Sequence, residues 1–332
     1  MISHCRIKIF ADDSKLIKSI NNLEDKNLME EDIKSVMNWA KNNKMELNKS
    51  KFQLLQHGNK IELKTPYKID QEVEIQKSNT VKDLGVNISE DLSFDEHITK
   101  ITNEAKRFAG WIFRIFKSRR PEIILLLFNT YVRPRLEYCS PLWSPYQKRH
   151  QYQIEAIQRT ITSRISGTEG LNYWERLKYL KIPSLQRRRE RYQIIHIWKI
   201  AKSLIPNDLN LQFYNTSRYG QKCRIPKFNY RQKHLSTLKF NSFFSRGPAL
   251  FNILPEKIKS SKSLAIFKSN LQNFLDKIPD NPPTPNYVGQ NTNSIVEWVN
   301  DGNDHGIGQL PEDLVVEDPA VNMVEPLEVS AY

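Results

Sequence analysis

The sequence predicts an α+β protein, in which short strands and one helix are followed by a longer, all-helical segment. Up to Phe94, apolar and polar residues alternate over short runs, a pattern typical of strands with one buried side. After Phe94 the apolar residues follow helical spacing, which is typical of amphipathic helices. With 332 residues, the chain is long enough to form two ordinary domains with hydrophobic cores.

The first segment, residues 1–94, opens with two short strands around a pair of acidic residues. Residues 5–10 and 14–20 predict the strands, and Asp12 and Asp13 lie between them. A strand–turn–strand unit with a doubled negative charge at its tip is therefore expected very early in the chain.

A helix and further strands are expected in the rest of this segment. Apolar residues from Leu28 to Asn42 follow helical spacing. Alternation then returns and predicts strands within three stretches, which are residues 44–58, 67–76 and 80–94. Gly85 lies inside the last of them, where a glycine indicates a turn or a close approach of the backbone.

Residues 95–204 predict an all-helical domain rich in Lys, Arg and aromatic residues. Its helical segments, separated by Pro and Gly, are residues 95–116, 121–133, 147–166, 171–180 and 184–204. Residues 205–276 predict a smaller basic module, which mixes basic and aromatic residues and ends in a helix at 263–276.

Residues 277–332 predict a disordered acidic tail. Many Pro, Asn and Asp residues and little apolar periodicity indicate at most a short helix near 293–299. From Asp280 to the end there are ten acidic residues and no Lys or Arg. The 50 Lys and Arg and the other 27 acidic residues therefore lie in residues 1–279, whose net charge is +23.

This charge makes a polyanion the expected partner, and nucleic acid is the commonest polyanion in a cell. The alternative is a basic surface that is simply solvated. No run of about eighteen apolar residues indicates a membrane span, and the N-terminus lacks the apolar core of a signal peptide. The three cysteines form no CxxC pair. An intracellular location, in the nucleus or the cytoplasm, is expected.

The acidic pair Asp12 and Asp13 has two interpretations. Adjacent carboxylates at a hairpin tip can bind Mg²⁺, which prefers hard oxygen ligands, and paired cations of this kind support phosphoryl transfer. Such a site needs at least one further carboxylate from another strand. The alternative is a plain turn, since Asp favours turns and Asp13 could cap the following segment. The dipeptide alone does not distinguish the two.

Several motifs in order along the chain resemble those of reverse transcriptases, most closely those of non-long-terminal-repeat retrotransposons of the jockey-like kind. The segment "IKIFADDSKLI" resembles the catalytic box, and "IKSVMNWAKNNKMELNKSKFQLL" resembles the helix that follows it, with Asn48 and Lys51 at matching positions. The frequent Cys of that family is Phe52 here, at a position that we interpret as packing. Later matches are "VKDLGVNISEDLSFDEHI", "YVRPRLEYCSPLWSP", "IEAIQRTITSRISG" and "FFSRGPALFNILPEKIKSSKSLAIFKSNLQNFL".

The resemblance implies a truncated reverse-transcriptase palm at 1–94 and a thumb-like helical domain at 95–204, ahead of the basic module. It implies that the chain is the C-terminal portion of an RNA-directed DNA polymerase acting on an RNA template and a DNA primer. Asp12 and Asp13 would hold Mg²⁺ in the intact enzyme. The family's third metal-binding Asp lies upstream of the hairpin, so the chain alone is expected to be inactive. The alternative is a non-enzymatic remnant that binds nucleic acid.

The same resemblance assigns further site residues. Lys51 would donate a proton to the leaving pyrophosphate. The alternative is that Lys51 is simply a solvated surface lysine. Leu84 and Gly85 would form the turn that grips the primer, against the alternative of an ordinary hairpin. Basic residues of the helical domain are further candidates for contact with nucleic acid: Lys106, Arg107, Arg114, Arg187, Arg188 and Arg189.

Two of these assignments have plain alternatives. The run "RRRER", residues 187–191, could contact phosphates or act as an import signal, and it could equally be an exposed helix face. The tryptophans are expected to be mostly core residues: Trp39, Trp111, Trp143, Trp174 and Trp198.

Overall fold

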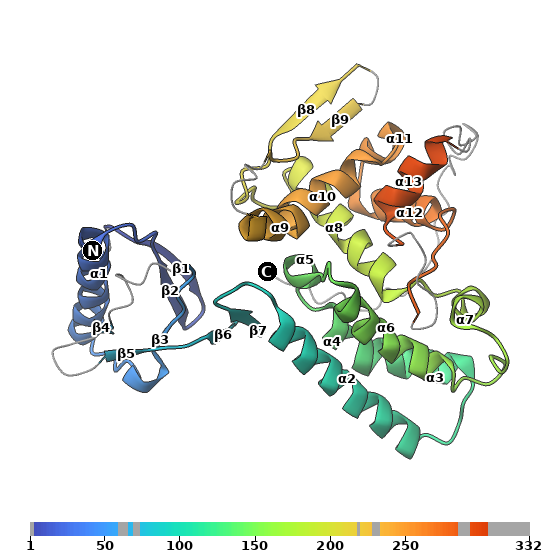
Figure 1. The fold of residues 1–332 in the computed structure, drawn as a ribbon, viewed down its shortest axis with the longest axis horizontal. Helices are drawn as coiled ribbons and strands as arrows, with labels where there is room; N and C mark the ends of the chain where they lie inside the picture. The colour runs from blue at the N-terminus through green and yellow to red at the C-terminus, as the bar shows by residue number, and fades with distance from the viewer. Residues whose placement is uncertain are drawn as a thin grey trace. The chain divides into compact units, whose positions relative to one another are not determined.

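The chain folds into two compact units, and a computed structural model describes residues 3–58, 66–68, 74–217, 220–227, 233–284 and 293–304. The N-terminal unit comprises Met1–His97 and the C-terminal unit Ile98–Tyr332. Each unit is described here by itself, with its elements labelled as in Figure 1. Small sheets dominate the first unit and helices the second, so the predicted α+β class is confirmed.

The N-terminal unit contains one long helix and short strands. Its elements are β1 (Arg6–Phe10), β2 (Asp13–Ile17), α1 (Leu23–Asn42), the 3₁₀ turn η1 (Lys49–Lys51), β3 (Gln53–Leu54), β4 (Tyr67–Lys68), β5 (Glu74–Lys77), β6 (Thr80–Asp83) and β7 (Val86–Ser89). Strands β1 and β2 pair antiparallel, as do β6 and β7. In the remaining sheet β5 lies between β3, which is parallel to it, and β4, which is antiparallel.

Helix α1 begins at Leu23, ahead of the predicted start at Leu28. The side chain of Asn22 caps the helix by accepting a hydrogen bond from the backbone N–H of Asp25. The first turn of α1 has one apolar residue, the exposed Leu23, and therefore shows no apolar periodicity, whereas the cap and the acidic residues Glu24 and Asp25 favour a helix start here.

The core of the N-terminal unit is small. Ile33 of α1 is buried with Tyr67 and Ile75 of the sheet, and Leu16 of β2 packs against them. Phe52 also packs against this cluster, which confirms its interpretation as a packing residue. Of the strand predicted at 44–58, only β3 forms, and residues 49–51 form the 3₁₀ turn η1, which the side chain of Asn48 caps by accepting from the N–H of Ser50.

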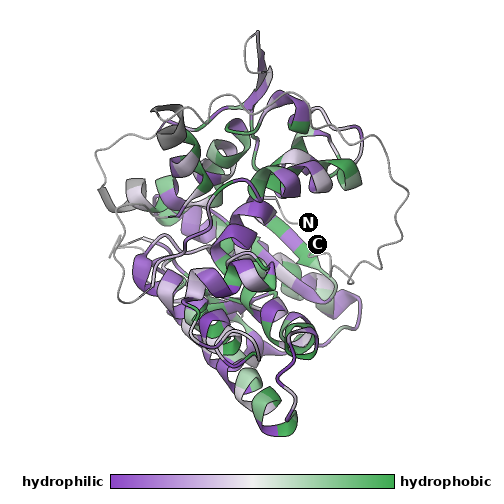
Figure 2. Ribbon diagram, turned by 90° about the vertical axis from the view of Figure 1, so that its right-hand side faces the viewer, coloured by the Kyte–Doolittle hydropathy of each residue, from purple (hydrophilic) through white to green (hydrophobic). Residues whose placement is uncertain are grey.

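The described residues of the C-terminal unit are mainly helical, with a β-hairpin formed by β8 and β9. Its elements are α2 (Asp95–Ile115, which begins at the division between the units), α3 (Pro121–Leu127), the π-helix η3 (Phe128–Val132), α4 (Arg133–Glu137), α5 (Ser140–Trp143), α6 (Lys148–Thr162), α7 (Tyr173–Leu180), α8 (Leu185–Ala201), β8 (Phe213–Thr216), β9 (Gly220–Cys223), α9 (Lys233–Asn241), α10 (Phe243–Asn252), α11 (Glu256–Lys259), α12 (Leu264–Leu275) and α13 (Ile295–Asp304). Hydrophobic and hydrophilic residues are interleaved along these helices, as Figure 2 shows.

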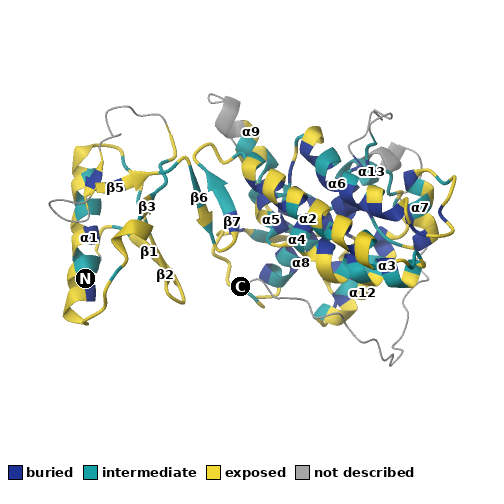
Figure 3. Ribbon diagram, turned by 90° about the horizontal axis from the view of Figure 1, so that it is seen from below, coloured by how far each residue is buried: buried dark blue, intermediate teal, exposed yellow. Residues whose placement is uncertain are grey.

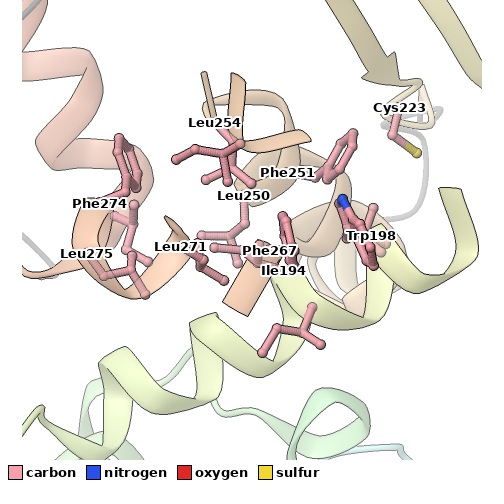
Figure 4. Close-up of a cluster of buried hydrophobic side chains, with 14 of the residues drawn as sticks. Ile194, Trp198, Cys223, Leu250, Phe251, Leu254, Phe267, Leu271, Phe274 and Leu275 are labelled. Carbon is pink, nitrogen blue, oxygen red and sulfur yellow. The ribbon is translucent and has the colours of Figure 1, made fainter. Parts of the chain in front are cut away.

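The C-terminal unit is organised around α8. A hydrophobic cluster joins α8 to α10, α12 and the start of α13. In this cluster the rings of Trp198 and Phe267 stack, with centroids 4.4 Å apart and planes 12° from parallel (Figure 4). The predicted boundary between residues 204 and 205 therefore falls inside one hydrophobic cluster.

Part of the predicted acidic tail lies among the described residues. Residues 277–284 follow α12, and α13 (Ile295–Asp304) forms near the position of the short helix expected at 293–299. Ile295 is fully buried in the core, and Val296 and Val299 pack against the same cluster. Three apolar residues on one helical face thus outweigh the polar composition around them. Residues 305–332 lie outside the described part of the chain.

Replacing Phe267 by Ala should destabilise the C-terminal unit by about 3–5 kcal/mol, because a fully buried aromatic ring is removed and leaves a cavity. Ile266 precedes it on α12 and is 48% exposed, so Ile266→Ala serves as the matched control, with an expected loss below about 1 kcal/mol. Urea unfolding followed by tryptophan fluorescence measures both. Equal losses in the two variants would contradict the assigned packing.

Candidate functional site

The acidic pair lies at the tip of the β1–β2 hairpin, as predicted. Phe10 pairs with Asp13 at the end of the ladder, so Ala11 and Asp12 form a two-residue turn. Ala11 takes a positive φ of 51°, a conformation that residues other than glycine rarely adopt. Asp12 and Asp13 are both exposed, and most of the hairpin is exposed with them (Figure 3).

A buried carboxylate anchors the chain just before β1. Asp32 of α1 is 1% exposed and accepts hydrogen bonds from the backbone N–H groups of Ser3, His4 and Cys5, at 3.0, 2.9 and 2.7 Å. Burial by itself would raise the pKa of Asp32, but these donors stabilise the charged form and hold the pKa below its ordinary value. Asp32 therefore fixes where β1 starts, and with it the register that places the acidic pair at the tip.

The two hairpins of the N-terminal unit are joined by an ion pair. Lys15 of β2 contacts the carboxylate of Asp83 at the end of β6. Directly after Asp83, Leu84 and Gly85 form the β6–β7 turn with φ values of 43° and 86°, so the predicted turn is confirmed. Both residues need positive φ, as in a type I′ turn, which explains the glycine.

Lys51, the other predicted catalytic residue, lies at the end of η1 and is exposed. The structure therefore leaves its amine accessible to solvent.

The described residues provide two carboxylates, Asp12 and Asp13, at the position of the implied metal site. Among the described residues, no three His, Cys, Asp or Glu side chains lie close enough together to hold one metal ion. The hairpin tip offers two neighbouring carboxylates, and complete coordination of Mg²⁺ needs further ligands, since this ion demands six oxygen donors in near-octahedral geometry.

A basic and aromatic surface lies along α2 in the C-terminal unit. Lys106, Arg107, Trp111 and Arg114 are all exposed, and the last three follow the spacing that places residues on one helical face. Trp111 is 47% exposed although tryptophans were expected to be mostly core residues. The predicted contacts Arg107 and Arg114 thus share a helical face with an accessible indole ring, and Lys106 is exposed next to Arg107 in the chain.

Two residues from neighbouring helices complete this surface. Tyr131 of η3 meets the ring of Trp111 edge to face, with centroids 6.4 Å apart. Arg135 of α4 donates a hydrogen bond to the carbonyl of Tyr131, and its guanidinium lies 3.7 Å from the ring centroid of Phe108. We call these exposed or partly exposed residues the α2 face: Lys106, Arg107, Trp111, Arg114, Tyr131 and Arg135. The periodicity of α2 contained no signal for the last two.

The structure corrects the prediction that the run "RRRER" contacts nucleic acid. Arg187 and Arg189 are only 3% and 1% exposed, so they do not present a surface to nucleic acid in this structure. Arg188 forms hydrogen bonds to the carboxylate of Glu137 and to the hydroxyl of Tyr192. The physical reason is that α8 packs against α5, α6, α10 and α12, which bury Arg187 and Arg189.

Comparisons with known proteins give little further information. No family model matches the chain, and no solved structure matches it. An uncharacterized protein of Caenorhabditis elegans is 26% identical over 114 residues, which are 33% of this chain and 58% of that protein. The chain thus spans less than two thirds of the length of this relative. No helix in the described ranges is both long and apolar enough to cross a membrane.

Acid should loosen the β1–β2 hairpin through Asp32. The pKa of Asp32 is lower in the folded state than in the unfolded state. The ionised carboxylate therefore stabilises the fold at pH values above the unfolded-state pKa of about 4, and this stabilisation is lost as the pH falls through the folded-state pKa. The unfolding free energies of wild type and Asp32→Ala should therefore converge below about pH 4. The unfolding free energies are measured from the backbone NMR signals of β1 during urea unfolding at each pH.

Lys34 is an exposed neighbour of Asp32 on α1, so Lys34→Ala is the matched control and should keep the wild-type pH profile. A constant difference between wild type and Asp32→Ala from pH 7 to pH 3 would contradict the role assigned to this carboxylate.

Proposed function

We propose that this chain binds nucleic acid through the α2 face, as the C-terminal portion of an RNA-directed DNA polymerase. The observation that carries the proposal is that the exposed tryptophan Trp111 shares a helical face with the exposed Arg107 and Arg114 of α2. Basic groups neutralise backbone phosphates, and an accessible indole ring can stack on a base of any identity. The same surface therefore supports binding without sequence preference.

Different residues of the α2 face would contact phosphates and stack on bases. Lys106, Arg107 and Arg114 face solvent, where they can contact phosphates along a strand. Tyr131 packs against the edge of Trp111 and limits the orientations of the indole ring, which reduces the entropy lost on stacking. Arg135 is held by Tyr131 and Phe108, so it adds positive charge from a fixed position.

The polymerase part of the proposal is supported by the resemblance to reverse transcriptases and by the hairpin geometry. Asp12 and Asp13 are accessible at a tip, and the turn at Leu84 and Gly85 belongs to the next hairpin. In the intact enzyme the two carboxylates would be ligands of Mg²⁺, which supplies charge stabilisation for nucleotidyl transfer. Lys51 would serve as proton donor, and RNA template and DNA primer would be the partners.

A second candidate is a protein that binds nucleic acid without catalysis. It is favoured by one observation, namely that the described residues provide the acidic pair with no third ligand of the His, Cys, Asp or Glu kind. Primer extension on an RNA template with Mg²⁺ tests the second candidate. Because the chain alone is expected to be inactive, binding without extension agrees with both candidates, whereas extension that disappears in Asp12→Ala would exclude the second.

Replacing Lys106, Arg107 and Arg114 together by Gln should weaken binding and its dependence on salt. Each phosphate contact contributes about 0.7 to the slope of log K against log salt for single strands and about 0.9 for duplex DNA. Loss of three contacts should therefore lower the slope by about 2 to 3. Fluorescence anisotropy with a labelled oligonucleotide at several salt concentrations measures this change.

The matched control removes the same charge elsewhere in the C-terminal unit. Lys239, Lys262 and Lys277 are exposed and lie outside the α2 face, so their triple change to Gln should leave the slope nearly unchanged. Equal losses in both triple variants would mean that net charge alone drives binding, and the assigned surface would be wrong.

Trp111→Ala should weaken binding to single-stranded nucleic acid by about 1–3 kcal/mol, the usual contribution of one base stacked on an aromatic ring. Unlike the charge variants, it should leave the salt slope unchanged. Trp39 of the N-terminal unit is also exposed, at 57%, so Trp39→Ala is the matched control. Titrations at several salt concentrations measure both quantities, and an affinity unaffected by Trp111→Ala would exclude stacking at this position.

A further inference from the structure

A carboxylate occupies the amino end of α8. Asp280, which follows α12, accepts hydrogen bonds from the backbone N–H of Ser184 at 2.7 Å and from the Ser184 hydroxyl at 2.8 Å. The side-chain amide of Asn293 donates to the same carboxylate at 3.0 Å, and Arg187 Nε lies 3.9 Å from its Oδ1. Backbone, hydroxyl, amide and guanidinium groups thus converge on one anion.

These groups form the type of site that binds oxyanions. Ser184 is the N-cap of a 17-residue helix, and its hydroxyl also accepts from the N–H of Arg187 at 3.0 Å. The amino end of a helix carries partial positive charge and N–H groups without partners inside the helix. Phosphate groups bind at such ends for this reason, particularly beside an arginine.

Arg187 provides a second, independent observation, because two of its nitrogens have no hydrogen bond to the described residues while Asp280 occupies the site. This side chain is 3% exposed, and its Nη2 donates to the carbonyl of Pro279 at 2.7 Å. Its Nε and Nη1 have no hydrogen-bond partner in the described part of the chain, although Nε faces Asp280 at ion-pair distance. A carboxylate has two oxygens and a phosphate group has more, so phosphate could satisfy donors that Asp280 leaves unused.

The segment that carries Asp280 and helix α13 are held by different contacts. The other anchors of this segment are the carbonyl of Pro282, which accepts from the Trp174 ring at 2.8 Å, and the N–H of Asn281, which donates to Asn293 at 2.7 Å. The Asp280 side chain is 20% exposed, so the site borders on solvent. Ile295 is anchored separately, by its own burial and by its N–H to Glu190 at 3.1 Å.

We propose that Asp280 is a built-in occupant of an oxyanion site at the amino end of α8, and that a phosphate group binds the same donors when Asp280 is displaced. The phosphate has two possible sources, a free phosphate ion or a backbone phosphate of nucleic acid. Only the second source rests on the proposed function. In that case the segment at 279–282 restrains nucleic-acid binding until it is displaced.

The test uses the full chain with Asp280→Ala, which removes the carboxylate and leaves room for an anion. Thermal unfolding is followed at constant ionic strength while inorganic phosphate replaces chloride. The variant should melt about 5 °C below wild type in chloride, and phosphate should raise its melting temperature saturably. Asp280→Asn keeps the site filled, so phosphate should affect it no more than wild type. If Asp280→Ala does not fold, Asp280→Ser provides the same readout.

A melting temperature of Asp280→Ala that responds equally to phosphate and chloride would overturn the proposal. An equal phosphate effect in Asp280→Asn would overturn it as well, because the ion would then bind somewhere else. Both thermal unfolding experiments are done without nucleic acid, so their results do not depend on whether the α2 face binds nucleic acid.

A second arm distinguishes the sources of the phosphate. If the ligand is a backbone phosphate, Asp280→Ala should bind an oligonucleotide several-fold more tightly than Asp280→Asn, which has the same net charge, and inorganic phosphate should abolish the difference. Equal oligonucleotide affinities together with thermal rescue by phosphate would assign the site to the free ion. The triple Gln variant of Lys106, Arg107 and Arg114 tests the proposed function separately.

Discussion

The structure of the C-terminal unit depends on charged residues buried along α8. Glu155 of α6 accepts hydrogen bonds from the Tyr173 hydroxyl at 2.5 Å and from the N–H of Leu185 at 3.2 Å. Its burial raises the pKa of the carboxyl group, while the hydrogen bond from Tyr173 and the charge of Arg189 favour the ionised form. Buried charges cost several kcal/mol unless they are paired, so α8 is stable only where α6 and α7 supply these partners.

The arginines of the C-terminal unit therefore fall into a buried and an exposed group. Arg187 and Arg189 are buried, and burial lowers the pKa of the Arg189 guanidinium. Arg107 and Arg114 of α2 are exposed to solvent. Nucleic acid would therefore meet α2, where phosphates displace only water and counterions from the basic groups. At α8 a phosphate would first have to displace Asp280.

The N-terminal unit shows the same use of a buried acid on a smaller scale. Its hydrophobic core is small, and Asp32 anchors the start of β1 by accepting three backbone hydrogen bonds. The acidic pair at Asp12 and Asp13 lies at the opposite end of β1, exposed and without a third ligand among the described residues. The hairpin is thus fixed at its base and open at its tip, an arrangement that suits ligands approaching from solvent.

The sequence by itself determined the local structure, because periodicity, caps and turns depend on neighbouring residues. The hairpin around Asp12 and Asp13, the turn at Gly85 and most helix positions were predicted for this reason. Tertiary structure decided what depends on distant residues. The run at 187–191 has the composition of a solvated face, yet Glu155 and other helices bury it, and Ile295 orders a polar segment by packing into a distant core. Tyr131 joins Trp111 only because two helices pack together, and no spacing within one helix encodes that contact.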